Sequence, residues 1–112
     1  MRSEITAANE YHTPENTPHL LLDRLMFNSR LVFTANYLKN VFKARSAAKK
    51  GRFDTAAWVD SSQDVLTDVE RCGGRIHITG MDNIRKCQGP VLFLSNHMST
   101  LETMIFPGII QP

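Results

Sequence analysis

The chain has 112 residues, of which 42% are hydrophobic, and its 13 Lys and Arg against 11 Asp and Glu give a net charge of +2. This composition suits a folded chain that forms one small domain or part of a larger one, and the charge is too small to indicate nucleic acid as a partner. Because Cys72 and Cys87 fit neither a disulfide framework nor a zinc site, we expect reduced thiols, no metal and a cytoplasmic protein.

Residues 1–17 are polar and show no periodicity, so we expect them to form a loose leader. They contain no apolar segment of the kind found in signal peptides. At the end of this leader Thr17 can cap a helix, and Pro18 suits the first helical position. We therefore expect a helix to begin at Pro18.

Nothing in residues 18–49 breaks a helix, and within 26–43 the apolar residues gather on one broad, aromatic side: Phe27, Leu31, Phe33, Tyr37, Leu38, Val41 and Phe42. Six cations without an acid follow between Lys39 and Arg52. Such a helix can pack on a domain, or it can lie in a membrane interface with its cations on anionic headgroups. Both explanations stay open. Its longest uncharged stretch, Leu31 to Leu38, is far shorter than the ~20 residues that span a bilayer.

A second helix is expected from the Asp54 cap to about Cys72, with Gly73 and Gly74 as its end. Its apolar side carries Trp58, which we expect to be a core anchor, together with Val65, Val69 and Cys72. Residues 18–72 thus form a helical region that is a candidate membrane-interfacial element.

The pattern changes at "RIHITG", where Ile76 and Ile78 alternate with the polar residues His77 and Thr79, as in a half-buried strand. A loop over residues 80–89 is expected to lead to "VLFL", residues 91–94, whose unbroken apolar run is typical of a strand covered on both sides. From Ser99 onward we expect a helix that Pro107 and Gly108 kink or end.

Residues 95–102, "SNHMSTLE", permit two interpretations. Ser99 and Glu102 fit a capping box, in which Glu102 is purely structural. Alternatively, His97 lies at the carboxyl end of a strand, where α/β proteins bind ligands, and Glu102 can orient its imidazole as a general base. Asn96 and Ser99 are then candidate substrate-binding residues. Ser95 and Ser99 lie outside a G-x-S-x-G motif, so the attacking group can belong to the substrate.

The segment "GRIHITGMDNIRKCQGPVLFLSNHMSTLET" resembles the opening of the glycerolipid acyltransferase domain, as in 1-acylglycerol-3-phosphate acyltransferases. The shared features are a strand, G-x-[DE]-N, a short basic loop and G-P-V-x-F-x-S-N-H-x-S-x-x-D, except that this chain has Glu102 where the family usually has the final Asp. In that family the histidine of H-x4-D activates a glycerol hydroxyl, the acid orients the histidine, and acyl-CoA or acyl carrier protein donates the acyl group. The resemblance implies that His97 is the base and Glu102 its partner, with no cofactor.

The resemblance also implies an α/β fold. Two leading helices would come first, and residues 73–112 would then supply the first strands and helix of an acyltransferase-type sheet domain. The family's later blocks, G-x-x-F-[IV]-x-R and F-P-E-G-T, are not present in the sequence. We therefore expect an incomplete, amino-terminal part of an enzyme that is inactive alone. Because family members commonly place amphipathic helices before this domain, residues 18–50 are expected to bind a membrane surface peripherally.

Two rival hypotheses belong to other classes. The chain can be a non-catalytic module that binds a membrane surface or a protein through the helix between Phe27 and Phe42. A metal-assisted hydrolase built on His97 and Glu102 is the second rival, and it is disfavoured because no other histidine has ligand spacing.

Overall fold

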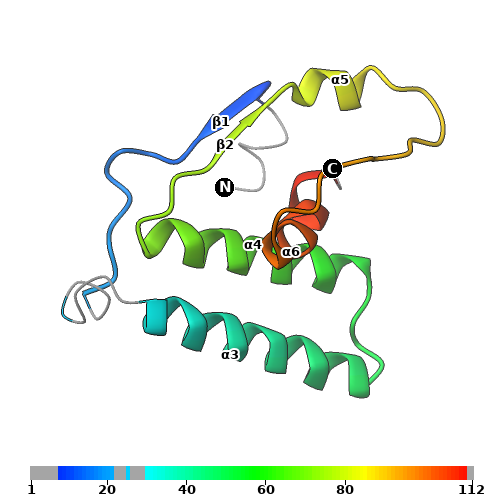
Figure 1. Ribbon diagram of the computed structural model, residues 1–112. Helices are drawn as coiled ribbons and strands as arrows, with labels where there is room; N and C mark the ends of the chain where they lie inside the picture. The colour runs from blue at the N-terminus through cyan, green and yellow to red at the C-terminus, as the bar shows by residue number, and fades with distance from the viewer. Residues whose placement is uncertain (1–7, 22–24, 26–29, 111–112) are drawn as a thin grey trace.

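The computed structural model describes residues 8–21, 25 and 30–110. Within these ranges the chain forms four helices and one antiparallel sheet of two strands (Figure 1). In chain order the elements are β1 (Glu10–His12), α3 (Arg30–Lys49), α4 (Thr55–Arg71), β2 (His77–Thr79), α5 (Met81–Arg85) and α6 (Thr100–Ile110). The protein is therefore of mixed α and β structure, as the sequence predicted in general terms.

Helix α4 is the centre of the arrangement, with α3 packed on one side and α6 on another (Figure 1). Its limits confirm the sequence prediction. The Asp54 carboxylate accepts a hydrogen bond of 2.8 Å from the Ala57 N–H at the start of the helix. At the other end Gly73 adopts a positive φ of 85°, a conformation that only glycine reaches without strain.

The core lies on the side of α4 that carries Val59, Val65 and Leu66, all of them buried. Leu66 packs against Tyr11 of β1, and three isoleucines pack against this pair: Ile76 just before β2, Ile78 in β2 and Ile105 in α6. The expectation for Trp58 was wrong. Its side chain is half exposed, because α4 turns Val59 and Leu66 toward the core and Trp58 lies beside that face.

Strand β1 corrects the expectation that residues 1–17 form a loose leader. It pairs with β2, so that Tyr11 lies opposite Ile78, and Tyr11 is buried. The predicted alternation in β2 is confirmed, with Ile76 and Ile78 turned inward and His77 exposed. Residues 1–7 lie outside the described ranges.

The buried carboxyl of Glu70 ties β1 to α4. The hydroxyls of Tyr11 and Thr13 each donate to Glu70 Oε1 over 2.7 Å. The Thr13 hydroxyl also accepts a 2.8 Å hydrogen bond from the Ile76 N–H. Because these polar groups satisfy one another, Glu70 can be buried without a cation.

The first long helix does not begin at Pro18. Residues 17–20 are not helical: the Thr17 hydroxyl donates to the Pro14 carbonyl over 2.7 Å, and the Leu20 N–H donates to the Arg71 carbonyl over 3.1 Å. The Leu20 contact holds the segment against the end of α4. The predicted helical residues 22–24 and 26–29, which include Phe27, lie outside the described ranges.

The segment between β2 and α6 differs most from expectation. The predicted loop over residues 80–89 contains the short helix α5. Residues 91–94 do not form the predicted covered strand; they have no regular secondary structure, and Leu92 and Leu94 are 83% and 87% exposed. Among the described residues, no strand follows β2 in the chain.

Helix α6 begins at Thr100 and, contrary to the expectation that it could end at Pro107, continues to Ile110. Pro107 has no N–H to donate within the helix. Ser62 of α4 compensates nearby: its hydroxyl contacts the Met104 carbonyl, lies 2.8 Å from the Ile105 carbonyl and accepts from the Gly108 N–H over 2.9 Å. A Cβ at Gly108 would lie 2.8 Å from the Gln63 amide nitrogen, so glycine permits this close approach.

Candidate functional site

The candidate site lies where the chain turns into α6. His97 stands three residues before the helix, and Glu102 occupies its first turn. The turn brings the two side chains together, so that His97 Nδ1 lies 3.3 Å from Glu102 Oε2. The geometry needed for a base and its orienting acid is present.

The same glutamate caps the helix. Glu102 Oε1 accepts hydrogen bonds from the backbone N–H groups of Met98 and Ser99, over 2.9 and 3.2 Å. Ser99 Oγ in turn accepts from the Leu101 N–H over 3.2 Å. The capping box is thus observed, with the serine oxygen bound to the N–H of the second helical residue in place of the third. These backbone contacts fix the carboxylate in place, which is what an orienting acid requires.

The two members of the pair differ in exposure. The His97 side chain is 67% exposed, whereas that of Glu102 is 25% exposed. A carboxylate facing Nδ1 favours the tautomer with its proton on that nitrogen, which leaves Nε2 as a bare base. Nothing in the turn covers the imidazole, so an alcohol can approach it from solvent.

The two candidate substrate-binding residues, Asn96 and Ser99, differ in their contacts. The Ser99 hydroxyl serves as the helix cap and also lines a hollow beside Glu102. Asn96 is exposed and makes no hydrogen bond within the part of the chain that the structure describes. Of these two residues only Ser99 lines this hollow, which Glu102 also lines and His97 does not.

The hollow has a volume of about 480 Å³ and lies between β2 and α6. Its wall is mostly apolar and includes Ile76, Ile78, Leu101, Ile105, Phe106 and Ile109, with Glu102 at one side. Sequence analysis did not predict it, because its two walls come from elements more than 20 residues apart. A cavity of this size and character suits an apolar group placed beside Glu102.

Of the other histidines, His77 lines the same hollow from the β2 side. His77 stacks on His12 across the β1 and β2 pair, with ring centroids 3.9 Å apart. Across residues 8–21, 25 and 30–110, no three His, Cys, Asp or Glu side chains gather as a metal site would require.

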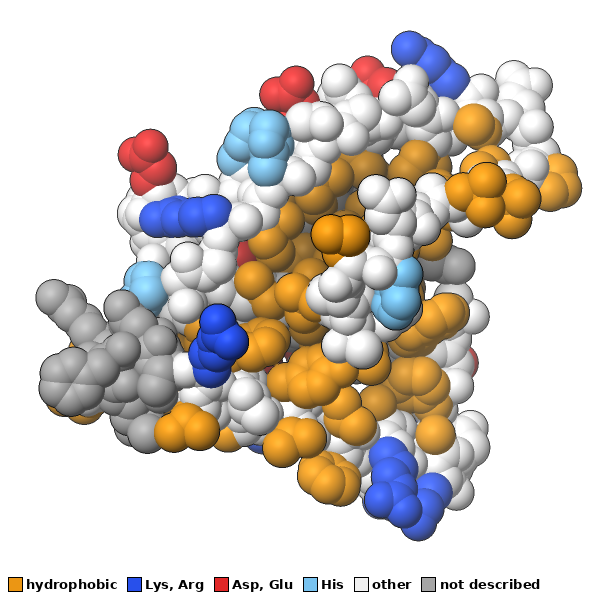
Figure 2. Space-filling view, in the orientation of Figure 1, with side chains coloured by type: hydrophobic (Ala, Val, Ile, Leu, Met, Phe, Trp, Pro, Cys, Tyr) orange, Lys and Arg blue, Asp and Glu red, His pale blue; other side chains and the backbone are white. Residues whose placement is uncertain are grey.

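Helix α3 carries a second exposed feature. Leu31, Leu38 and Phe42 point outward, whereas Asn40 is buried toward α4. Figure 2 shows hydrophobic side chains along α3 and Lys or Arg near its end. We call Leu31, Leu38 and Phe42 the outer stripe of α3; Arg45 and Lys49 continue it on the same side of the helix. No described helix has the length and apolar character needed to cross a bilayer.

Comparisons of this chain with protein-family models, with curated proteins and with solved structures found no match.

Proposed function

We propose that this chain carries the base of a glycerolipid O-acyltransferase, which moves a fatty acyl group from acyl-CoA or acyl carrier protein to a hydroxyl of a lysophospholipid or glycerol phosphate. The observation that carries the proposal is the 3.3 Å approach of His97 Nδ1 to Glu102 Oε2, with the imidazole left open to solvent. The resemblance of residues 73–110 to that family supplies the reaction class.

In this reaction His97 Nε2 takes the proton of the acceptor hydroxyl while the oxygen attacks the thioester carbonyl. The carbon–sulfur bond then breaks, and the thiolate leaves with a proton returned from the imidazolium. Glu102 holds the ring and stabilises its protonated form. No covalent acyl-enzyme is required, which agrees with the use of the Ser99 hydroxyl as a helix cap.

The surroundings of the pair support an apolar substrate. The hollow between β2 and α6 borders Glu102, and aliphatic side chains line most of it. An acyl chain placed there would lie close to the reacting hydroxyl. The outer stripe of α3, with Arg45 and Lys49 after it, supports peripheral binding to an anionic membrane, where such substrates reside.

The test is acyl transfer to lysophosphatidic acid or glycerol 3-phosphate, measured with the protein expressed from its complete reading frame. A general base contributes ~10²–10⁴-fold, so His97→Ala is expected to lower the rate by that factor. Glu102→Gln should leave weak activity, and Glu102→Asp should retain or raise it, because aspartate is the acid that the resembled family normally carries.

The matched control is His19→Ala, which removes an exposed histidine that does not line the hollow between β2 and α6. It is expected to leave the rate unchanged. If His97→Ala transfers acyl groups as fast as the unmodified protein, His97 is not the base and the proposed mechanism is wrong.

The outer stripe of α3 also favours a second function, that of a non-catalytic module which binds a membrane surface or a protein. This alternative needs only the exposed side chains Leu31, Leu38 and Phe42. It predicts membrane or protein binding together with no acyl transfer by the unmodified protein, so the same assay separates the two functions.

A further inference from the structure

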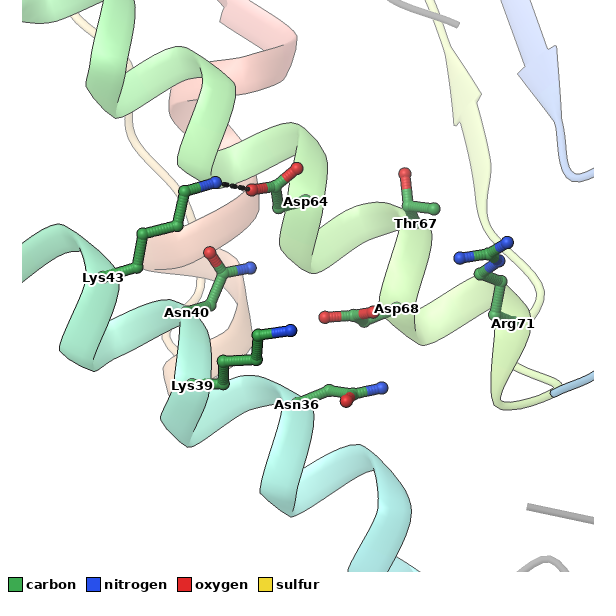
Figure 3. Close-up of a pocket in the computed structure, with 8 residues that line it drawn as sticks. All are labelled: Asn36, Lys39, Asn40, Lys43, Asp64, Thr67, Asp68 and Arg71. Carbon is green, nitrogen blue, oxygen red and sulfur yellow. Dashed lines mark hydrogen bonds and ion pairs between the residues drawn. The ribbon is translucent and has the colours of Figure 1, made fainter. Parts of the chain in front are cut away.

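A polar groove separates α3 from α4. Its volume is about 260 Å³, and Figure 3 shows eight side chains around it. All eight are polar or charged: Asn36, Lys39, Asn40, Lys43, Asp64, Thr67, Asp68 and Arg71. Two amphipathic helices normally meet through apolar faces. Here α3 turns amides and cations toward its neighbour while Leu38 and Phe42 point outward, so packing alone does not account for the groove.

Asn40 is the most informative side chain in this groove. It is only 6% exposed, and its amide makes no hydrogen bond to any other residue that the structure describes. The amide nitrogen and oxygen keep some contact with solvent, because among the described residues the fully buried polar side-chain atom without a partner is Gln63 Oε1. Asn40 lines the groove, so a bound polar group can supply the missing partner.

The charged side chains around Asn40 indicate which kind of polar group could bind there. Lys43 Nζ binds Asp64 Oδ2 over 2.8 Å, which pairs one cation with one carboxylate. Lys39 and Arg71 remain, and in Figure 3 they lie on opposite sides of Asp68, with the Lys39 ammonium directed toward that carboxylate. Burial raises the pKa of the Asp68 carboxyl, and the Asp64 carboxylate raises it further, whereas Arg71 and Lys39 oppose the rise. The three cations and two carboxylates that line the groove leave it with one excess positive charge.

We propose that this groove binds a phosphate group, carried by a small soluble phosphate or by a phospholipid headgroup. Lys39 and Arg71 would hold the phosphate oxygens by charge-assisted hydrogen bonds, and the Asn40 amide would donate a third bond. Asp68 can accept a hydrogen bond from a hydroxyl of the same ligand. The groove is smaller than the ~300–1,000 Å³ of cavities that hold drug-sized ligands, which suits a headgroup-sized molecule. None of its lining residues belongs to the His97 site, so the proposal holds whether or not the chain transfers acyl groups.

The test follows the side-chain amide of Asn40 by nitrogen-15 NMR while inorganic phosphate is added, with chloride at equal ionic strength as the salt control. A saturable shift with phosphate alone is expected. Lys39→Gln and Arg71→Gln should each weaken binding about tenfold, since each removes a charge-assisted hydrogen bond. Lys50→Gln, which removes an exposed cation outside the groove, should bind as the unmodified protein does.

A second arm distinguishes the source of the phosphate, using vesicles of phosphatidylcholine with or without phosphatidic acid. If the groove takes a headgroup, Arg71→Gln weakens binding to the phosphatidic acid vesicles more than Lys50→Gln does. If it takes a soluble phosphate, the two variants bind vesicles equally while only Arg71→Gln loses inorganic phosphate. Circular dichroism verifies that the variants fold. No saturable shift and equal vesicle binding by both variants would overturn the proposal, as would equal weakening of phosphate binding by Lys50→Gln.

Discussion

Helices α3 and α4 lie side by side but place their apolar residues in opposite ways (Figure 1). Helix α4 buries Val59, Val65 and Leu66 against β1, β2 and α6, whereas α3 exposes Leu31, Leu38 and Phe42 and turns Asn40 inward. The same residue types therefore have different consequences. On α4 they stabilise the fold, and on α3 they are available to bind something outside it.

Leu66→Ala is expected to have the largest effect, because it removes an apolar side chain that stabilises the fold from α4. Leu66 is fully buried, and truncating a buried leucine costs about 2–5 kcal/mol of unfolding free energy. Leu92→Ala is the matched control, because this exposed leucine should change stability by less than about 0.5 kcal/mol. Urea denaturation measures both. Equal losses would show that the core is not centred on α4.

The second-largest loss of unfolding free energy is expected from a substitution in the polar part of the core. Tyr11→Phe removes the hydrogen bond of 2.7 Å to the buried Glu70 and leaves that carboxyl with the Thr13 hydroxyl. The expected loss is about 1.5 kcal/mol of unfolding free energy. Tyr37→Phe on α3 removes a hydroxyl outside this network and should be nearly neutral. If both variants unfold at the same urea concentration, the network does not hold β1 to α4.

Phe42→Ser tests the exposed apolar residues of α3. Since Phe42 is exposed, the substitution should leave the unfolding free energy within about 0.5 kcal/mol of the original. It should weaken binding to phosphatidylglycerol vesicles about tenfold, because a phenylalanine that enters the interface gains about 1.5 kcal/mol. Vesicle sedimentation measures the binding, with added salt and phosphatidylcholine vesicles as controls. Unchanged binding would remove the outer stripe of α3 from the membrane proposal.

The smallest effect concerns Asp68 at the boundary between the two helices. Burial, and then the Asp64 carboxylate, raise the pKa of Asp68 in the folded protein above its ordinary value of 3.8. The folded state therefore favours the protonated form, so the contribution of Asp68 to stability falls as the pH rises through the folded pKa.

Asp68→Asn should remove this dependence and stabilise the protein near neutral pH by no more than about 0.5 kcal/mol, since the site is partly open to water. Urea denaturation between pH 3 and pH 7 measures it. A gain that is larger at low pH than at neutral pH would contradict the sign of this prediction.

Sequence reasoning succeeded where the causes are local. The Asp54 cap, the glycine end of α4 and the capping box of Ser99 with Glu102 all depend on residues within a few positions of one another. The approach of Glu102 to His97 follows from the same short turn. Alternation of apolar residues likewise located β2.

The failures concern contacts between distant residues. Nothing near Tyr11 in the sequence indicates that β2 will pair with it, so β1 was assigned to a loose leader. Residues 91–94 have the composition of a covered strand, but such a strand needs neighbours, and the described structure provides none. Helical periodicity separated the two sides of α3 without showing that the polar side would face α4.

The link from Tyr11 to Glu70 has a consequence for synthesis on the ribosome, because its partners are 59 residues apart. At ~5–20 residues per second, the nascent strand β1 must wait roughly 3–12 seconds before the end of α4 has even been translated. Closing so long a loop also carries an entropic penalty that local helix formation does not. Helix α4 can therefore form during translation, whereas the amino-terminal residues that complete its core are among the last to become structured.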